Sequence, residues 1–474
     1  MQELPAASNK DLSRNLATRG YKLPGVFERF DQLGAGAYGR VFKAVRKNAE
    51  SVEYAVKRQL LGNFDNSSVH ILRETSVLHA LKGSPNIVKV CDAFLASVRE
   101  GQYEIWIVLE CYPTNLQDLI DSKPFGEKDA RRVVFQILRG VNSLHRKDIV
   151  HRDMKPSNIL MKVEPLLEAV ICDFGLSRSV HGLTSQQQKK TEDLKPTGYS
   201  TSVSDTNASD TNALVSPVTL TRIVSVRVAT ANYRAPEMFG FVDVSIMKVQ
   251  DFKAMDIYAV GLTWAAMLTM RTVLSHHDEY FPENFLLLEN LKKVDMPTLD
   301  DVKEAGYTSE ATSFILDVMN GNSGAIINNW ASVKMQEPEY VLHREEVLRS
   351  EGVTIDHWIE SWDAPATAEA LDLIRKSTKF CYRHRPTVKA LLTDPYFEDL
   401  LHAAGDMNLE DSREHIEDVK VAMGSQLRRL NDMMERRRQA AASLAPPVLT
   451  RTASVQQSEV DLSKIMDMLR ADLE

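Results

Sequence analysis

Two short polar stretches constrain this chain more than any other part of its sequence. They are HRDMKPSN at 151–158 and DFG at 173–175, and their aspartates Asp153 and Asp173 lie 20 positions apart. Asp153 is suited to accepting a proton, and Lys155 stands beside it. Asn158 and Asp173 supply the oxygen atoms that magnesium, a hard cation, prefers. The combination is what phosphoryl transfer requires, and a fold that uses it must bring both stretches together.

A glycine-rich turn precedes these stretches, with the sequence GAGAYGRV at 34–41. Glycines at such a turn let backbone amides approach phosphate oxygens with no side chain in the way. The same GxGxxG pattern occurs in dinucleotide sites, but there a helix must follow the glycines directly. Here the run Val41–Val45 is typical of a strand. The sequence therefore favours a strand-turn-strand phosphate site.

Lys57 ends the strand-like run Tyr54–Lys57, which would place its ammonium under the phosphates. A helix is predicted over 69–81 from its apolar spacing, and Glu74 on that helix offers a carboxylate to hold Lys57. Taken alone, Lys57 would be interpreted as a solvated surface charge. A pair of this kind orients the lysine more than it stabilises the fold, because desolvation offsets most of its attraction.

Composition narrows the class of protein. The chain has 474 residues and a net charge of −8, so it can bury a large core, and its mild acidity disfavours a dedicated nucleic-acid binder. Its 4 cysteines are scattered without metal-ligand spacing, which indicates reduced thiols in a cytosolic or nuclear protein. No apolar run is long enough to span a bilayer, and the N-terminus lacks a secretion signal.

Taken in order, these motifs resemble those of eukaryotic protein kinases, over about residues 25–400. The family pattern continues with APE at 235–237, with Asp256 in DIYAVG and with Arg385 in HRPT. The segments ILRETSVL, IWIVLECYPTNL, HRDMKPSNIL and YRAPE resemble those of mitogen-activated protein kinases, within the group that also contains cyclin-dependent kinases. The KPSN form is similar to serine/threonine kinases, in which Thr230 would bridge Asp153 and its lysine.

The resemblance implies an α+β fold of two lobes, a small β-rich N-lobe and a larger, mostly helical C-lobe. The expected divisions are a polar arm at 1–24, the N-lobe at 25–112, the C-lobe at 113–400 and a helical extension at 401–474. The C-lobe would contain a long activation segment at 173–237 and an insert at about 280–366. Amphipathic patterns at 416–434 and 462–473 predict two helices in the extension.

The resemblance also implies ATP and Mg²⁺ as cofactors. The catalytic residues would be Asp153, Lys155, Lys57 and Glu74, and the metal ligands Asn158 and Asp173. Leu109 aligns with the gatekeeper, and 110–112 with the hinge that meets adenine. The nucleotide-binding positions carried over are Leu33, Gly34, Ala35, Gly36, Ala37, Tyr38, Gly39, Arg40, Val41, Ala55, Lys57, Glu110 and Tyr112.

The activation segment departs from the family pattern. It has 65 residues (237 − 173 + 1), and the Thr-x-Tyr expected directly before Val228 is replaced by SVR at 225–227. A TGY sequence at 197–199 lies upstream in Ser/Thr-rich sequence, where it is either a displaced dual site or a coincidence. The phosphosite candidates are Ser225, Thr221, Thr197 and Tyr199. The resemblance implies that Arg73, Arg152 and Arg178 would bind an activating phosphate.

Two functions from different classes remain open at this point. The first is an active serine/threonine kinase of the mitogen-activated type, or another kinase of the cyclin-dependent-like group. The second is a scaffold on a kinase fold, although no catalytic residue is lost. Ala231 and Asn232 replace an arginine and a tryptophan of the family, which puts proline-directed specificity in doubt. The expected partners are protein substrates, an upstream kinase and a phosphatase, with no cyclin, nucleic acid or membrane, in a monomer located in the cytoplasm or nucleus.

Overall fold

The computed structural model divides the chain into two compact units. It describes residues 27–36, 39–46, 52–61, 74–99, 102–123, 125–180, 230–274, 283–322, 347, 352–405 and 409. The first unit holds the described residues up to Tyr112 together with Asp173–Gly175, and the second holds those of Pro113–Cys172 and Leu176–Asp411. The predicted arm at 1–24 and both predicted helices of the extension lie outside the described residues.

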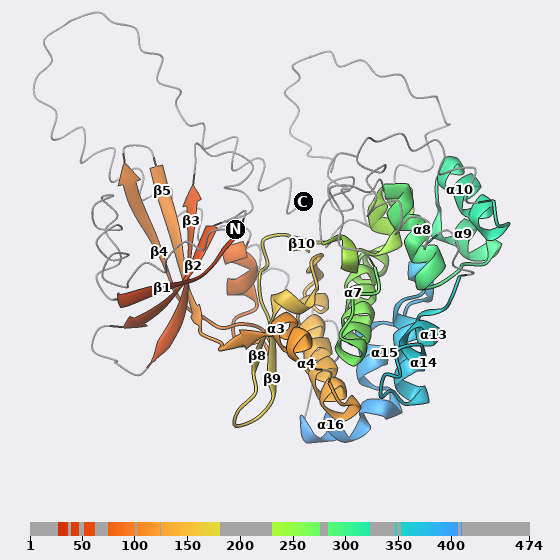
Figure 1. The fold of residues 1–474 in the computed structure, drawn as a ribbon. Coiled ribbons are helices and arrows are strands. Elements are labelled where there is room, and N and C mark those ends of the chain that lie inside the picture. The colour runs from red at the N-terminus through yellow and green to blue at the C-terminus, as the bar shows by residue number, and fades with distance from the viewer. Residues whose placement is uncertain are drawn as a thin grey trace, which may run out of the picture. The chain divides into compact units, whose positions relative to one another are not determined.

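The first unit contains a five-stranded antiparallel sheet in the order β1-β2-β3-β5-β4 (Figure 1). Its strands are β1 Phe27–Gly36, β2 Gly39–Arg46, β3 Glu53–Leu61, β4 Val90–Arg99 and β5 Gln102–Glu110. Alternate residues face a core that includes Phe42, Val56 and Trp106. Between β3 and β4 lies a helical segment at 74–80, within the range that the sequence predicts.

The glycine-rich turn joins β1 to β2, and Gly36 pairs with Gly39 across this hairpin. Gly39 has φ +147°, and a Cβ atom there would lie 2.2 Å from the carbonyl oxygen of Arg58. Only glycine fits this position, because any side chain would collide with β3. The strand that follows the glycines agrees with the strand-turn-strand interpretation.

The second unit is mostly helical. Its α-helices are α3 Leu116–Ser122, α4 Glu127–His145, α7 Val249–Thr269, α8 Glu283–Lys293, α9 Leu299–Ala305, α10 Ser309–Met319, α13 Ile355–Glu360, α14 Ala368–Ser377, α15 Val388–Leu392 and α16 Glu398–Ala403. Helix α7 is buried on all faces from 251 to 268, and it packs against α4 and α14 (Figure 1). A helix that is apolar all round is expected at the centre of a domain.

Short strands carry the catalytic stretches within this unit. The strands are β6 Thr114–Asn115, β7 Ile149–Val150, β8 Ile159–Lys162, β9 Glu168–Ile171 and β10 Arg178–Ser179. They form a three-stranded sheet in the order β6-β8-β9 and a pair of β10 with β7. The sequence predicts mostly helix here, because strands of two to four residues are too short to show a periodic pattern.

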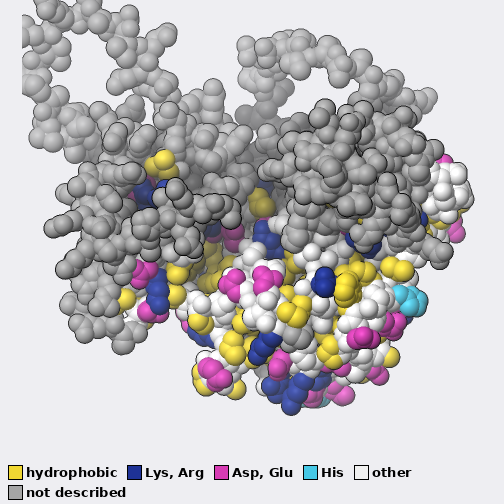
Figure 2. Space-filling view, in the orientation of Figure 1, with side chains coloured by type: hydrophobic (Ala, Val, Ile, Leu, Met, Phe, Trp, Pro, Cys, Tyr) yellow, Lys and Arg dark blue, Asp and Glu magenta, His cyan; other side chains and the backbone are white. Residues whose placement is uncertain are grey.

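The α+β prediction is confirmed, with a sheet-rich N-terminal unit and a helical C-terminal unit. On the face shown in Figure 2, basic and acidic side chains are interspersed over the coloured surface. Among the described residues, no helix is both long and apolar enough to cross a membrane.

Candidate active site

A lysine and two carboxylates meet in the first unit. The Lys57 ammonium on β3 lies 2.6 and 2.9 Å from the two carboxylate oxygens of Glu74, and 3.2 Å from Oδ1 of Asp173. The Lys57 side chain is 12% exposed and that of Glu74 only 2%. Burial by itself lowers the pKa of Lys57, but the two carboxylates outweigh it, so the net shift is upward. Lys57 therefore carries its charge across the physiological range.

Sequence reasoning missed a second partner of Glu74. The side-chain amide of Gln59, which is fully buried, donates to Oε2 of Glu74 at 3.0 Å. Residues i and i+2 share one face of a strand, so Lys57 and Gln59 both point to the same carboxylate. That spacing was the available signal, because a glutamine two positions beyond a strand lysine faces whatever the lysine faces.

The aspartate of HRDMKPSN is surrounded by donors in the second unit. Oδ1 of Asp153 accepts hydrogen bonds from the Thr230 backbone amide at 3.0 Å and from the Thr230 hydroxyl at 3.1 Å. The Lys155 ammonium donates to that hydroxyl oxygen at 2.6 Å, and it lies 2.9 Å from Oδ2 of Asp153. Thr230 thus bridges Asp153 and Lys155, as the sequence predicts.

Asp256 on α7 holds the backbone of the same stretch. Its carboxylate accepts from the backbone amides of His151 and Arg152 and contacts Nε2 of His145, each at 2.9 Å. Arg152 has φ +69°, a left-handed conformation that costs about 1–3 kcal/mol unless its surroundings enforce it. The two amide bonds to Asp256 enforce it.

Burial strongly affects which of the two side chains, His145 or Asp256, carries the proton that they share. Both side chains are almost completely inaccessible to solvent. Burial is the largest influence on His145 and lowers its pKa, against the opposing effect of Asp256. For Asp256 burial raises the pKa, but the bonds from His145 and Arg152 outweigh it and the net shift is downward. We therefore assign a neutral His145 that donates from Nε2 to an ionised Asp256.

Asn158 and Asp173 offer the oxygen ligands that magnesium prefers. Asn158 uses its amide nitrogen to donate to Asp153, at 2.8 Å to the backbone oxygen and 3.0 Å to Oδ2. Neither bond uses its amide oxygen. The side chain of Asp173 is 43% exposed. The donor chemistry of both residues fits Mg²⁺, and they belong to different units.

Glu237, the last residue of the predicted activation segment, forms a buried ion pair with Arg385. The guanidinium of Arg385 binds Glu237 through two parallel bonds of 2.6 and 2.8 Å, and both side chains are 0% exposed. Arg385 also donates to three backbone carbonyls and lies over the ring of Tyr258, 4.7 Å from its centroid. Burial alone would lower its pKa, yet Glu237 raises it overall.

The described nucleotide-binding candidates lie on β1, β2, β3 and β5 or just after β5. Val41 pairs with Lys57, and Ala55 pairs with Leu109. Leu33 is 52% exposed, whereas Tyr112 is buried. Ala37 and Tyr38 lie outside the described residues.

The predicted phosphate switch is only partly described. Arg152 is buried, and Arg178 pairs with Val150 where β10 joins β7. The remaining candidates lie outside the described residues. They are Arg73, Ser225, Thr221, Thr197 and Tyr199.

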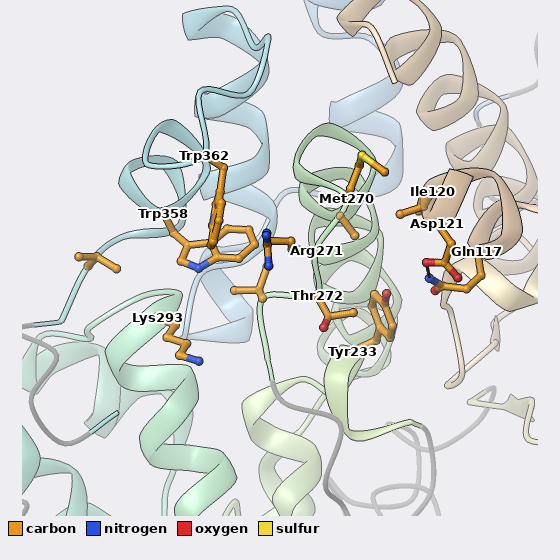
Figure 3. A pocket seen from close by; sticks show the side chains of 13 residues that line it. Gln117, Ile120, Asp121, Tyr233, Met270, Arg271, Thr272, Lys293, Trp358 and Trp362 are labelled. Atoms are coloured by element: carbon orange, nitrogen blue, oxygen red, sulfur yellow. Dashed lines mark hydrogen bonds between the residues drawn. The ribbon is translucent and has the colours of Figure 1, made fainter. Parts of the chain in front are cut away.

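A cavity of about 490 Å³ opens in the second unit, next to the residues that follow Thr230 (Figure 3). The Arg271 guanidinium lies over the ring of Trp362, 3.9 Å from its centroid. Tyr233 is buried, and its hydroxyl has no hydrogen-bond partner among the described residues. Three exposed apolar side chains also line this cavity, those of Met270, Val353 and Trp362. Such a lining suits a ligand with both an apolar part and a polar or anionic group.

Residues 27–397 match the family model described as "Protein kinase domain". This chain belongs to the protein kinase family. Among the relatives of this kinase is mitogen-activated protein kinase 2 of Pneumocystis carinii, 29% identical over 292 residues, which are 61% of this chain and 68% of the relative. Mitogen-activated protein kinase spk1 of Schizosaccharomyces pombe is 30% identical over 282 residues, 59% of this chain and 63% of the relative.

A third relative is extracellular signal-regulated kinase 1 of Dictyostelium discoideum, 26% identical over 395 residues, 83% of this chain and 59% of the relative. The chain therefore spans about three fifths to two thirds of the length of these relatives. The predicted resemblance of this kinase to mitogen-activated protein kinases is confirmed, and a scaffold is not favoured.

Proposed function

We propose that this kinase transfers the γ-phosphoryl group of ATP to serine or threonine in protein substrates, as a mitogen-activated kinase does. One observation carries the proposal: Asp153, Lys155, Asn158 and Thr230 are connected by hydrogen bonds in one unit. An ordinary surface turn has no reason to bury an aspartate among so many donors.

In this proposal Asp153 accepts the proton of the substrate hydroxyl as that oxygen attacks the phosphorus. Base assistance of this kind contributes roughly 10²–10⁴ in rate. Lys155 would neutralise charge on the transferred phosphoryl group, and Thr230 fixes the distance between the two side chains. Lys57 would orient the phosphates, with Glu74 and Gln59 keeping its ammonium in place.

Asn158 and Asp173 would hold magnesium. The ion, when bound, neutralises charge on the phosphate oxygens. Asn158 is fixed for this role because its amide nitrogen is committed to Asp153.

We propose further that the cavity beside Tyr233 receives a side chain of the protein substrate. Tyr233 follows Thr230 by three residues, and Thr230 contacts Asp153. The segment that positions the catalytic base therefore also lines the cavity. Arg271 and the Tyr233 hydroxyl, which has no hydrogen-bond partner in the described part of the chain, would favour an acidic or hydrogen-bonding side chain.

Activity would be switched by phosphate on the activation segment, with Ser225 the first candidate and Thr221 next. Arg152 and Arg178 remain as positions for reading that phosphate, because arginine binds phosphate through paired bonds. An upstream kinase and a phosphatase would then be partners, in the cytoplasm or nucleus.

A magnesium-dependent phosphate-incorporation assay tests the proposal. Asp153→Asn should lower kcat by about 10²–10⁴, since the base is lost while the shape is kept. Asp129→Asn is the matched control, because Asp129 is exposed in the first turn of α4 and its change should leave kcat unaltered. Incorporation by the wild type no greater than by Asp153→Asn would defeat the proposed activity. The same assay after phosphatase treatment tests the switch, which unchanged activity would contradict.

A further inference from the structure

A mixed group of ligating side chains lies away from the motifs used so far, where α9 meets the 3-10 turn η6 Tyr382–His384. Asp301, Cys381 and His384 each offer one ligand atom, and these atoms lie within 4.8 Å of one another. Within the described ranges, this is the one group of His, Cys, Asp and Glu side chains gathered so closely. Glu304 stands one helical turn beyond Asp301, on the same face of α9.

The histidine of this group faces a carboxylate at each ring nitrogen. Nδ1 of His384 lies 2.8 Å from Oδ1 of Asp301, and Nε2 lies 3.0 Å from Oε2 of Glu304. A neutral imidazole has only one N–H, so it can donate to only one of them. A metal ion on Nδ1 makes both contacts favourable, because Nε2–H then donates to Glu304. Metal-binding histidines generally donate their other N–H to a carboxylate, a backbone carbonyl or a water molecule.

The thiol has no role in a histidine–carboxylate ion pair, yet it lies in the group. Cys381 is 1% exposed. Asp301 is oriented too, since its other oxygen accepts bonds of 2.7 and 2.6 Å from the amide and hydroxyl of Thr298. A set of nitrogen, sulfur and oxygen donors is typical of zinc, whereas calcium and magnesium require mostly oxygen.

The two elements are already held together without the group. The Tyr382 hydroxyl donates to the carbonyl of Ala305 at 2.8 Å, and the Arg383 guanidinium donates to that of Glu304 at 2.6 Å. The nearby cations face other acids, with Lys379 paired to Asp295 at 2.9 Å and Arg383 at 3.7 Å from Asp251. The ligands are thus pre-positioned in a region where carboxylates attract a cation.

We propose that Asp301, Cys381 and His384 bind a zinc ion, with Glu304 as a positioning residue for the His384 ring. Binding converts the Cys381 thiol to a thiolate and releases its proton to solvent. Three protein ligands leave one of four tetrahedral positions for water. The ion would connect α9 to η6, and the 76 residues of 306–381 lie between these two elements in the sequence. No residue of the site belongs to the phosphoryl-transfer set, so the inference is independent of kinase activity.

Cobalt substitution tests the proposal on the full chain, reduced and stripped of metal. One equivalent of Co²⁺ should produce visible d–d bands and a thiolate-to-cobalt charge-transfer band, and Zn²⁺ should displace both. Cys381→Ser should abolish the charge-transfer band. Cys91→Ser and Cys172→Ser are the controls, and both should retain the band. Cys172 is included because it adjoins Asp173, a proposed magnesium ligand at which cobalt could also bind.

Since Cys381 is buried, its substitution can unfold the chain, and two further variants keep the test decisive. The His384 side chain is 43% exposed, and His384→Asn should weaken Co²⁺ binding with the far-ultraviolet circular dichroism unchanged. Glu304→Gln should lower affinity by about 10–100-fold, as loss of an orienting carboxylate does. Absence of a thiolate band in the wild type overturns the proposal, and so does equal affinity in these two variants.

Discussion

At the scale of single residues, the guanidinium of Arg271 packs on the indole ring of Trp362. No acidic side chain among the described residues forms an ion pair with it. Its charge therefore faces the cavity beside Tyr233. We expect Arg271→Ala to raise KM for an acidic protein substrate about tenfold, the equivalent of one charge-assisted contact of about 1.4 kcal/mol. KM for ATP should stay unchanged. Steady-state kinetics with both substrates varied would measure this.

Arg271→Lys is the informative companion. It keeps the charge but loses the planar group that stacks on Trp362, so it should restore the KM only in part. Equal KM values for Arg271→Ala and the wild type, over a panel of acidic and neutral peptides, would rule out the cavity as a substrate site.

Residues also mark the limit of what the sequence predicts. The contacts of Lys57 with Glu74 and of Thr230 with Asp153 were predictable, because each residue lies in a recognisable motif. The proposed zinc ligands were not, since Asp301 lies 80 positions before Cys381 (381 − 301) and the short spacing of Cys381 and His384 indicates no site by itself. The cysteine spacing alone gave no sign of a metal site, because only one ligand is a cysteine.

At the scale of elements, helices α7 and α14 approach closely at Gly261. A Cβ atom at this position would lie 2.6 Å from Cγ2 of Thr378 and 3.1 Å from Cβ of Ser377. We expect Gly261→Ala to lower the free energy of unfolding by about 1–3 kcal/mol through overpacking, despite the better helix propensity of alanine. Urea denaturation would measure the change.

A second substitution isolates the cause. Thr378→Ser removes Cγ2 but keeps the hydroxyl that donates to the carbonyl of Ile374 at 2.9 Å. In the double variant, the cost of Gly261→Ala should fall to less than half. Strictly additive effects would show that the clash with Thr378 is not the reason.

Helices α4 and α7 are also joined by His145 and Asp256, and this contact makes stability depend on pH. The pKa of His145 lies below its ordinary value of 6.5, so the unfolded chain binds the proton more readily than the folded one. The contribution of this group is therefore complete above about pH 6.5 and is lost as the pH falls through the folded-state pKa.

We expect the free energy of unfolding to decline below about pH 6.5, by at most about 1.4 kcal/mol per pH unit from this group. His145→Gln keeps a donor for Asp256 but cannot take up a proton. The slope of its unfolding free energy against pH should therefore be smaller, by an amount that corresponds to at most one bound proton. Unfolding of both proteins over a series of pH values measures the difference. Parallel profiles would contradict the assignment of a neutral His145.

The length of an element decides whether the sequence reveals it. Helix α4 repeats its apolar spacing over several turns, so the sequence indicates it. Helix α7 is buried on every side and has no such spacing, but its 21 residues are too long a buried run for a strand. The strands β7 and β10 have 2 residues each and exist because they pair with one another. No local pattern can predict them.

At the scale of the whole second unit, Arg385 and Glu237 join parts of the chain 148 residues apart. Glu237→Gln would leave a buried guanidinium without its counter-charge, and we expect a loss of about 3–5 kcal/mol in the free energy of unfolding. Arg385→Lys should be similarly costly, because lysine cannot form the two parallel bonds. Chemical denaturation would measure both losses.

The control for this pair is an ion pair on the surface. Arg375 and Asp372 lie 2.7 Å apart with side chains 44% and 35% exposed, so Arg375→Ala should cost less than about 1 kcal/mol. A loss for Glu237→Gln no larger than this would show that the buried pair does not hold the unit together.

The stretch between Val180 and Thr230 is fixed to one unit at both ends. The Val180 amide donates to the carbonyl of Asp148 at 2.7 Å, and the Thr230 amide donates to Asp153 at 3.0 Å. Closing a longer loop between fixed ends costs only about 0.6 kcal/mol for each doubling of its length. We therefore expect insertions into this stretch to change the free energy of unfolding little, while the contact between Asp153 and Thr230 is kept.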